Sequence, residues 1–224
     1  MDIIEAIRTR KSIRSFKPAP VSRQIIAEIL ELGGRAPSAM NNQPWEFAVL
    51  TGEVLEKVKQ KNIDKLHSGE PVQPEHLVVG WPPESVYRTR QVELAIDLFA
   101  LMDIPREDKL KRAQWLERGF RYFDAPAVII VLADKVLGEG PPLVDIGTAI
   151  QTICLVALNY GLGTCIEDQG VLYPEVLREF LPIPENKRIV IAIAIGYPDW
   201  DFPANSLESK REDLDSITGW YGFD

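Results

Sequence analysis

The chain has 224 residues, of which 46% are hydrophobic and 26% charged, a balance that suits a soluble globular protein with an ample buried core. Its net charge of -8 and its pI near 5.0 argue against nucleic acid or an anionic membrane as the main partner. The two cysteines, Cys154 and Cys165, lie in apolar stretches without CxxC or Cys/His spacing, so we expect buried free thiols, no metal site and no disulfide framework.

The first fifty residues predict short helices joined by extended chain. Asp2 and Ser22 each precede a stripe of isoleucines and are typical helix N-caps. The predicted order is helix, extended chain, helix and strand, over residues 2–9, 10–20, 22–33 and 45–51. The first residues carry acids where an export signal would carry bases, so we expect a cytoplasmic protein.

The middle of the chain contains an irregular excursion between helices. Residues 67–83 hold four prolines, both histidines and Trp81, a composition typical of binding loops and lids. A helix is predicted before it, over 53–66. Two more are predicted after it, near 84–102 and near 105–121 with Pro105 at its start.

The last hundred residues alternate apolar strands with helices. Strands are predicted over 127–133, 163–166 and 188–195, and helices over 142–160 and from Pro174 onward. The segment 142–160 is long and apolar, but Asp145 within it is costly in a bilayer, so we expect a core or subunit-interface helix. The aromatic tail 198–224 needs a surface to pack on. The whole order predicts an α+β sandwich with a mixed sheet.

Residues 8–23, here called the basic segment, carry six Lys or Arg residues and no acid within an acidic chain. In an extended chain, Arg10, Ser12 and Arg14 point to one side while Ile13 and Phe16 can anchor in the core. The guanidinium fork suits a phosphate or a carbonyl edge. A solvated basic face is the alternative, but it does not explain the missing acids.

Three further stretches carry polar chemistry. Residues 37–45, here called the amide box, contain Asn41, Asn42 and Gln43, whose amides can read the edge of a planar heterocycle or can simply form a polar loop. Residues 161–168 superficially suggest a dinucleotide fingerprint, but they follow a helix rather than a strand. Residues 209–211, Ser-Lys-Arg, either close a phosphate pocket or form an ordinary surface pair.

Together these stretches resemble the nitroreductase family of FMN-dependent oxidoreductases. The family opening Arg-x-Ser-x-Arg is present at residues 10–14, and its Pro-Ser-x-x-Asn-x-Gln-Pro-Trp box at residues 37–45. The helix that begins Asp145-Ile146-Gly147 and runs into residues 161–163 is similar to the central helix of that family. The resemblance extends nearly from end to end.

The resemblance implies one domain over 1–224, an α-β-α sandwich around a mixed, mostly antiparallel sheet. It also implies an intertwined homodimer with exchanged tails and FMN at the interface. One subunit would supply Arg10, Lys11, Ser12 and Arg14; the other would supply Pro37, Ser38, Ala39 and Asn41. Ile166 and Glu167 would lie near the flavin ring, and Lys210 and Arg211 near the phosphate.

The implied activity passes hydride from NAD(P)H through flavin N5 to a small acceptor such as a nitroaromatic or a quinone. Catalysis would need no residue beyond the flavin, with Arg14 tuning the N1–O2 edge. Residues 67–124 would form a lid or specificity insertion. Its candidate substrate contacts are Tyr87, Phe120 and Phe123, and its arginines suggest an anionic aromatic substrate. The alternatives are reductive dehalogenation of iodotyrosine-like phenols and non-catalytic flavin binding.

Overall fold

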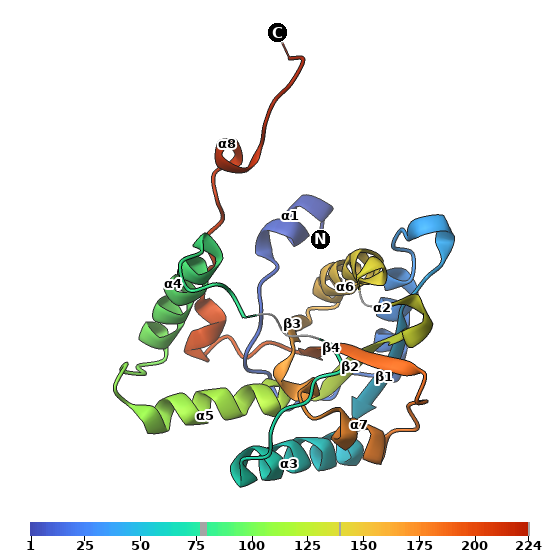
Figure 1. The fold of residues 1–224 in the computed structure, drawn as a ribbon, viewed down its shortest axis with the longest axis vertical. Helices are drawn as coiled ribbons and strands as arrows, with labels where there is room; N and C mark the ends of the chain where they lie inside the picture. The colour runs from blue at the N-terminus through green and yellow to red at the C-terminus, as the bar shows by residue number, and fades with distance from the viewer. Residues whose placement is uncertain (77–79, 139, 224) are drawn as a thin grey trace.

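The computed structural model describes residues 1–76, 80–138 and 140–223 and places a four-stranded sheet at the centre of the molecule (Figure 1). The strands are β1 (Glu46–Thr51), β2 (Ala127–Asp134), β3 (Gly163–Glu167) and β4 (Lys187–Gly196). They lie in the order β1-β2-β4-β3, and every neighbouring pair is antiparallel. An isolated parallel bridge joins Ser12 to Thr164 at the β3 edge.

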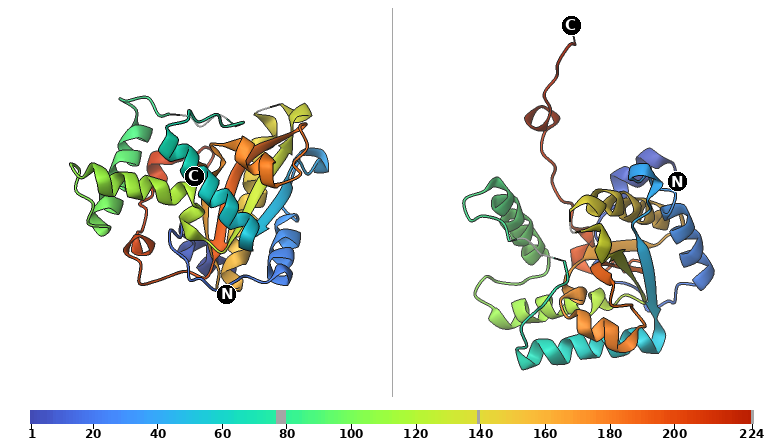
Figure 2. Two further views of the ribbon diagram at one scale, coloured as in Figure 1. Left: turned by 90° about the horizontal axis from the view of Figure 1, so that it is seen from below. Right: turned by 45° about the vertical axis from the view of Figure 1, so that its right-hand side comes forward.

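Helices cover both faces of this sheet, as Figures 1 and 2 show. One face is covered by α2 (Arg23–Gly33) and α6 (Pro141–Asn159), the other by α3 (Gly52–Ser68) and α7 (Pro174–Phe180). Strand β2 is therefore buried on both sides. Val128 and Ile130 face α3 and α7, while Ile129 and Val131 face α2 and α6. The predicted α-β-α sandwich and α+β class are confirmed.

Capping residues fix several helix starts where the sequence predicts them. Asp2 accepts hydrogen bonds from the amides of the first turn of α1 (Ile3–Thr9), and Ser22 accepts one from Ile25 N. The predicted start at Pro105 is wrong. Helix α5 (Lys109–Phe120) begins four residues later, because Asp108 caps it by accepting from Lys111 N.

Helices α4 (Val86–Leu101) and α5 form an arm beside the sandwich (Figure 1). Helix α4 contacts the body through a small cluster of Leu98, Ala204 and Leu207, bordered by Trp115, whereas α5 also packs on the main core through Phe120. The short helical turns of the structure are η1 (Ala39–Asn41), η2 (Tyr122–Asp124), η3 (Lys135–Leu137), η4 (Gln169–Val171), η5 (Pro203–Ser206) and α8 (Leu214–Ile217).

Helix α6 is mostly apolar but only partly covered. Residues 142–159 are long and hydrophobic enough to cross a membrane, with a mean hydropathy of 1.4, and 39% of them are buried in the molecule. One face packs on β2 and β4 through Ile146 and Ile153, as in a core helix. Val144 is exposed on another face. The chain alone therefore leaves part of this helix uncovered, with Val144 at its most exposed apolar position among the described side chains.

The C-terminal tail extends away from the sandwich (Figures 1 and 2). Helix α8 lies on this extension, and Trp220, Tyr221 and Phe223 are exposed on it. An exposed aromatic cluster on an extended tail is typical of a segment that packs on another surface.

Candidate functional site

The basic segment runs along the outer edge of β3. Ile13 N donates to Thr164 O at 2.9 Å, and Phe16 forms an isolated antiparallel bridge with Pro198. Ile13 and Phe16 are both buried, which confirms them as the predicted anchors. Gly163 permits this approach, since a Cβ there would lie 2.4 Å from Ile13 Cγ1.

The backbone of Arg14 is held by two distant side chains. Arg14 N donates to Asn205 Oδ1 at 2.6 Å, and Arg118 Nη2 donates to Arg14 O at 3.0 Å. The Arg14 guanidinium itself reaches only Ser12 O, at 3.3 Å. Within residues 1–76, 80–138 and 140–223, neither Arg10 nor Arg14 has a carboxylate partner. These two cations are thus available to a bound anion.

Two buried thiols lie beneath these arginines. Cys154 on α6 and Cys165 on β3 are free. Burial raises the pKa of Cys165 to about 12, and the charge of Arg14 opposes that rise. Burial likewise raises the pKa of Cys154, opposed in part by Arg10. The thiols stay protonated, so the positive charge at this edge is not neutralised from below.

Strand β3 ends in a buried carboxyl group. Ile166 is 38% exposed, whereas Glu167 is only 7% exposed. Glu167 Oε2 accepts from Gly170 N at 3.0 Å, and Oε1 is buried without a hydrogen-bond partner in the described structure. Burial raises the pKa of Glu167 to about 8, and the nearby Asp168 charge adds to the rise. At neutral pH this side chain is therefore largely a neutral acid.

Gly170 joins the end of β3 to the helical layer. Its carbonyl accepts from Tyr122 Oη at 2.7 Å and from Asn62 Nδ2 at 3.3 Å. A Cβ at Gly170 would lie 2.1 Å from the Tyr122 ring. Tyr122 is fully buried and has a left-handed φ of 54°. The turn after β3 is thus fixed from both sides.

The amide box lies at the N-terminal end of α6. Ala39 N donates to Asp145 Oδ2 at 3.0 Å, and Thr148 Oγ1 donates to Pro37 O at 3.0 Å. Met40 and Asn41 adopt left-handed φ angles of 51° and 57°. Met40 is 99% exposed. The box is therefore a strained loop, anchored at its base and open at its tip.

Within one chain the amide box and the basic segment lie beside different parts of α6. The box is bonded to Asp145, while Arg10 acts on Cys154, nine residues further along the helix. At 1.5 Å per residue this separation is roughly 14 Å along the axis. The structure does not bring the two motifs into contact in a single chain.

The start of the tail returns toward the basic segment. Lys11 Nζ lies 3.7 Å from Glu208 Oε1. Further along, Glu212 pairs with Arg90 of α4 at 2.7 Å. Arg211 donates to Ser209 Oγ at 2.7 Å and to nearby carbonyls. Lys210 and Arg211 border a cavity of about 550 Å³ against α4. Their predicted phosphate role stays a prediction.

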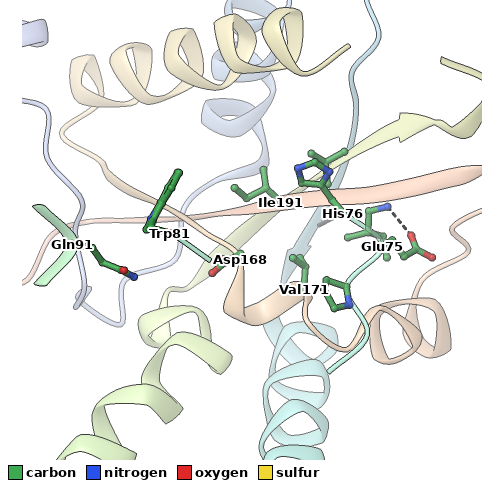
Figure 3. A pocket seen from close by; sticks show the side chains of 10 residues that line it. Glu75, His76, Trp81, Gln91, Asp168, Val171 and Ile191 are labelled. Carbon is green, nitrogen blue, oxygen red and sulfur yellow. Dashed lines mark hydrogen bonds between the residues drawn. The ribbon is translucent and has the colours of Figure 1, made fainter. Parts of the chain in front are cut away.

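The excursion after α3 lines a second cavity next to β3 (Figure 3). This cavity measures about 410 Å³ and is lined by Pro74, Glu75, His76, Trp81, Gln91, Asp168, Val171, Ile189, Val190 and Ile191. Glu75 closes one end, where it forms an ion pair with Arg178 at 2.8 Å and accepts from Ile189 N at 2.8 Å. The predicted loop therefore does border a concave site.

The predicted substrate contacts divide into two groups. Phe120 and Phe123 are 3% and 5% exposed and belong to the core under α5, so their burial speaks against a substrate role in this chain. Tyr87 is exposed and its ring centroid lies 5.7 Å from that of Trp81. Only Tyr87 remains a candidate.

Several positioning residues escaped the sequence prediction. Asn205 is fully buried and fixes Arg14 N, Ser15 O and Asp199 O. Asn62 and Arg118 also act over long sequence separations. No local pattern marks such residues, because their partners are decided by the fold. Among the described residues, no group of three His, Cys, Asp or Glu side chains is placed to hold a metal ion.

The comparisons with known proteins agree on one family. A model of the nitroreductase family matches residues 7–197. The chain is 32% identical to a nitrobenzene nitroreductase of Ectopseudomonas oleovorans, with 96% of this chain and 95% of the relative covered. It is 31% identical to a 4-nitrobenzoate reductase of Pseudomonas putida, with 100% and 97% covered. The solved structure of the FMN and NADPH-dependent nitroreductase NfnB from sphigopyxis sp. strain HMH matches with a TM-score of 0.94, at 29% identity and full coverage of both chains. The chain belongs to the nitroreductase family.

Proposed function

We propose that this protein is an FMN-dependent oxidoreductase that uses NAD(P)H to reduce small nitroaromatic or quinone acceptors. The observation that carries the proposal is the position of Arg10 and Arg14. These two arginines lie along the edge of β3 and have no carboxylate partner among the described residues. Relatives named as reductases of nitrobenzene and 4-nitrobenzoate support the same reaction class.

The residues present fit FMN. Arg10, Lys11 and Ser12 supply cations and a hydroxyl for a phosphate and its attached chain, and Arg14 supplies a fixed cation further along. When bound, the flavin supplies the hydride-transfer chemistry that the side chains of the site lack. Arg14 would stabilise the negative charge that the flavin gains on reduction. Ile166 gives the ring an exposed apolar contact, and Glu167, being neutral, adds no opposing charge.

We propose that the complete site forms only in a homodimer. The amide box and the basic segment lie apart in one chain, so a second copy would bring Pro37, Ser38, Ala39 and Asn41 to the flavin. The uncovered part of α6 and the exposed aromatic tail support a large interface between copies. The free thiols Cys154 and Cys165 fit a reducing cytoplasm.

We further propose that residues 1–224 act as one unit, with 67–124 setting acceptor specificity. Support comes from α4, which joins the body through a small cluster, and from the cavity that the excursion lines beside β3. Lys210 and Arg211 are kept as candidates for the phosphate, since the tail returns to Lys11 through Glu208.

The test is the visible spectrum of the purified protein before and after NAD(P)H is added. We expect a yellow protein whose flavin absorbance bleaches with NAD(P)H and recovers with nitrobenzene. Arg14→Ala should lower the bound flavin at least tenfold, because it removes a charge-assisted contact worth about 1.5–3 kcal/mol. Arg23→Ala, at an exposed position on α2, is the matched control and should retain flavin.

Other outcomes favour other functions. A yellow protein that NAD(P)H does not bleach would point to a non-catalytic flavin binder. Release of iodide from 3-iodotyrosine, without reduction of nitro compounds, would point to reductive dehalogenation. A colourless protein that takes up no added FMN contradicts both the proposal and these alternatives.

A further inference from the structure

The cavity lined by the excursion lies directly beyond the end of β3. Strand β3 pairs with β4 only as far as Glu167 opposite Ala192, so the edge of β4 before Ala192 is uncovered on that side. Ile189 and Ile191 on this edge line the cavity, and Asp168, the residue after Glu167, stands at its rim. The cavity thus begins one residue after the proposed flavin contact Glu167.

The cavity walls suit one aromatic ring. Trp81 offers an indole face that is about half exposed, and Val171 and Ile191 provide an apolar floor. In Figure 3, Trp81, Gln91 and Asp168 lie next to one another, with His76 beyond Ile191. A volume of about 410 Å³ is at the lower end of the range for small-molecule sites. Offset stacking on Trp81 would hold a substituted benzene ring.

The charges around the cavity are not those of a carboxylate-binding site. None of the lining residues is Lys or Arg. Glu75 is neutralised by Arg178, whereas Asp168 has no ion-pair partner within the part of the chain that the structure describes. Arg88 reaches the cavity wall, because its partner Gln91, whose Oε1 accepts at 2.7 Å, is a lining residue, whereas Arg90 is paired with Glu212, which does not line the cavity.

We infer that this cavity holds the aromatic ring of the electron acceptor on Trp81 and that Asp168 makes it select neutral nitroarenes over nitroarene carboxylates. The inference rests on the proposed function and names the acceptor class of the same site. It replaces the expectation, drawn from the arginines of the arm, of an anionic aromatic substrate. A carboxylate a few ångströms from Asp168 would meet an unscreened like charge.

The experiment compares two acceptors of nearly equal size, 4-nitrobenzamide and 4-nitrobenzoate. Equilibrium dialysis against the oxidised, FMN-saturated protein gives their binding constants, and steady-state rates with NAD(P)H give kcat/KM. We expect the amide to bind about tenfold more tightly, a difference of about 1.4 kcal/mol in binding free energy, because the benzoate places a like charge near Asp168. Asp168→Asn should reduce the ratio of the two binding constants several-fold. Asp103→Asn removes a carboxylate from an exposed turn elsewhere and should leave that ratio unchanged.

Trp81 provides a second, independent arm. Trp81→Ala should weaken binding of both compounds by the same factor, and Trp81→Phe should recover most of the loss. Arg88→Gln tests the opposite case, in which Arg88 recruits a carboxylate. Tighter binding of 4-nitrobenzoate by the wild type, or a ratio that Asp168→Asn leaves unchanged, would overturn the inference. A failure of the proposed function gives a different result. In that case the wild-type protein would not bind flavin, or its flavin would not be reduced by NAD(P)H.

Discussion

At the scale of single residues, Glu167 is an ionisable group that the fold removes from water. Its carboxyl group is buried at the end of β3, accepts one backbone hydrogen bond from Gly170, and has a second oxygen without a partner. An ionised carboxylate in that position would lack compensation, so burial raises its pKa from 4.5 to about 8. A neutral acid beside the proposed flavin ring avoids opposing the negative charge that reduction brings.

The raised pKa of Glu167 predicts a pH-dependent stability. Between pH 4.5 and 8 the folded protein holds a proton that the unfolded chain releases, so this group stabilises the fold fully below pH 4.5 and its contribution is lost as pH rises toward 8. The slope approaches about -1.4 kcal/mol per pH unit. In Glu167→Gln that slope should disappear from the free energy of unfolding. Urea unfolding at pH 5, 6, 7 and 8, at a fixed FMN concentration, measures this free energy for the wild type and for Glu167→Gln. If the free energy of unfolding changes with pH in the same way in both proteins, the raised pKa of Glu167 is contradicted.

At the scale of elements, the turn after β3 depends on contacts from two helices distant in sequence. Tyr122 and Asn62 both hold the Gly170 carbonyl, and Tyr122 sits in η2 with a left-handed backbone. The strain at η2 is compensated by this buried hydrogen bond and by core packing. The end of β3, and with it the proposed flavin contacts, therefore moves only if the α3 and α5 layer moves.

This coupling predicts that Gly170→Ala is destabilising. The added methyl group would lie 2.1 Å from the Tyr122 ring, so either the turn or the ring must shift. We expect the free energy of unfolding to fall by about 1–3 kcal/mol, as for overpacked cores. Gly80→Ala is the control, since nothing lies within 4 Å of its Cβ position. Thermal unfolding of both variants measures the difference; equal midpoints would show that the turn can relax freely.

At the scale of the whole molecule, the single chain leaves apolar surface uncovered. Val144 on α6 is 74% exposed, and the aromatic tail projects from the body. The amide box lies beside this end of α6 through Asp145. Pairing two copies through α6 would cover these surfaces and carry the box of one chain to the basic segment of the other.

The homodimer proposal predicts that a charge on α6 separates the copies. Val144→Asp places a carboxylate in the first turn of α6, where the helix dipole tolerates it, so the fold of each chain should survive. The molecular mass should fall from about twice to once 25.2 kDa, and the bound flavin should fall with it. Sedimentation velocity with absorbance at flavin wavelengths measures both. Val136→Asp, at an exposed position outside α6, should change neither. A wild-type protein that is already monomeric contradicts the proposal.

Local patterns in the sequence predict most elements because caps and periodicity act over a few residues. Asp2, Ser22 and the apolar runs of β2 and β4 place their helices and strands correctly. The absence of acids in the basic segment likewise marks a candidate anion site without any structure. The start of α5 is missed because Pro105 is a typical first-turn residue, whereas the cap is made by Asp108, which accepts from Lys111 N.

The sequence by itself determined the fold class, the family and the two motifs, since these depend on residue type and short spacing. Only the tertiary structure decided which side chains fix Arg14, that Glu167 is buried, and that Phe120 and Phe123 belong to the core. It also decided that Arg88 bonds the cavity residue Gln91, that Arg90 pairs with Glu212, and that Asp168 lines the cavity. The physical reason is that burial, and the pairing of charges far apart in sequence, exist only after the layers have packed.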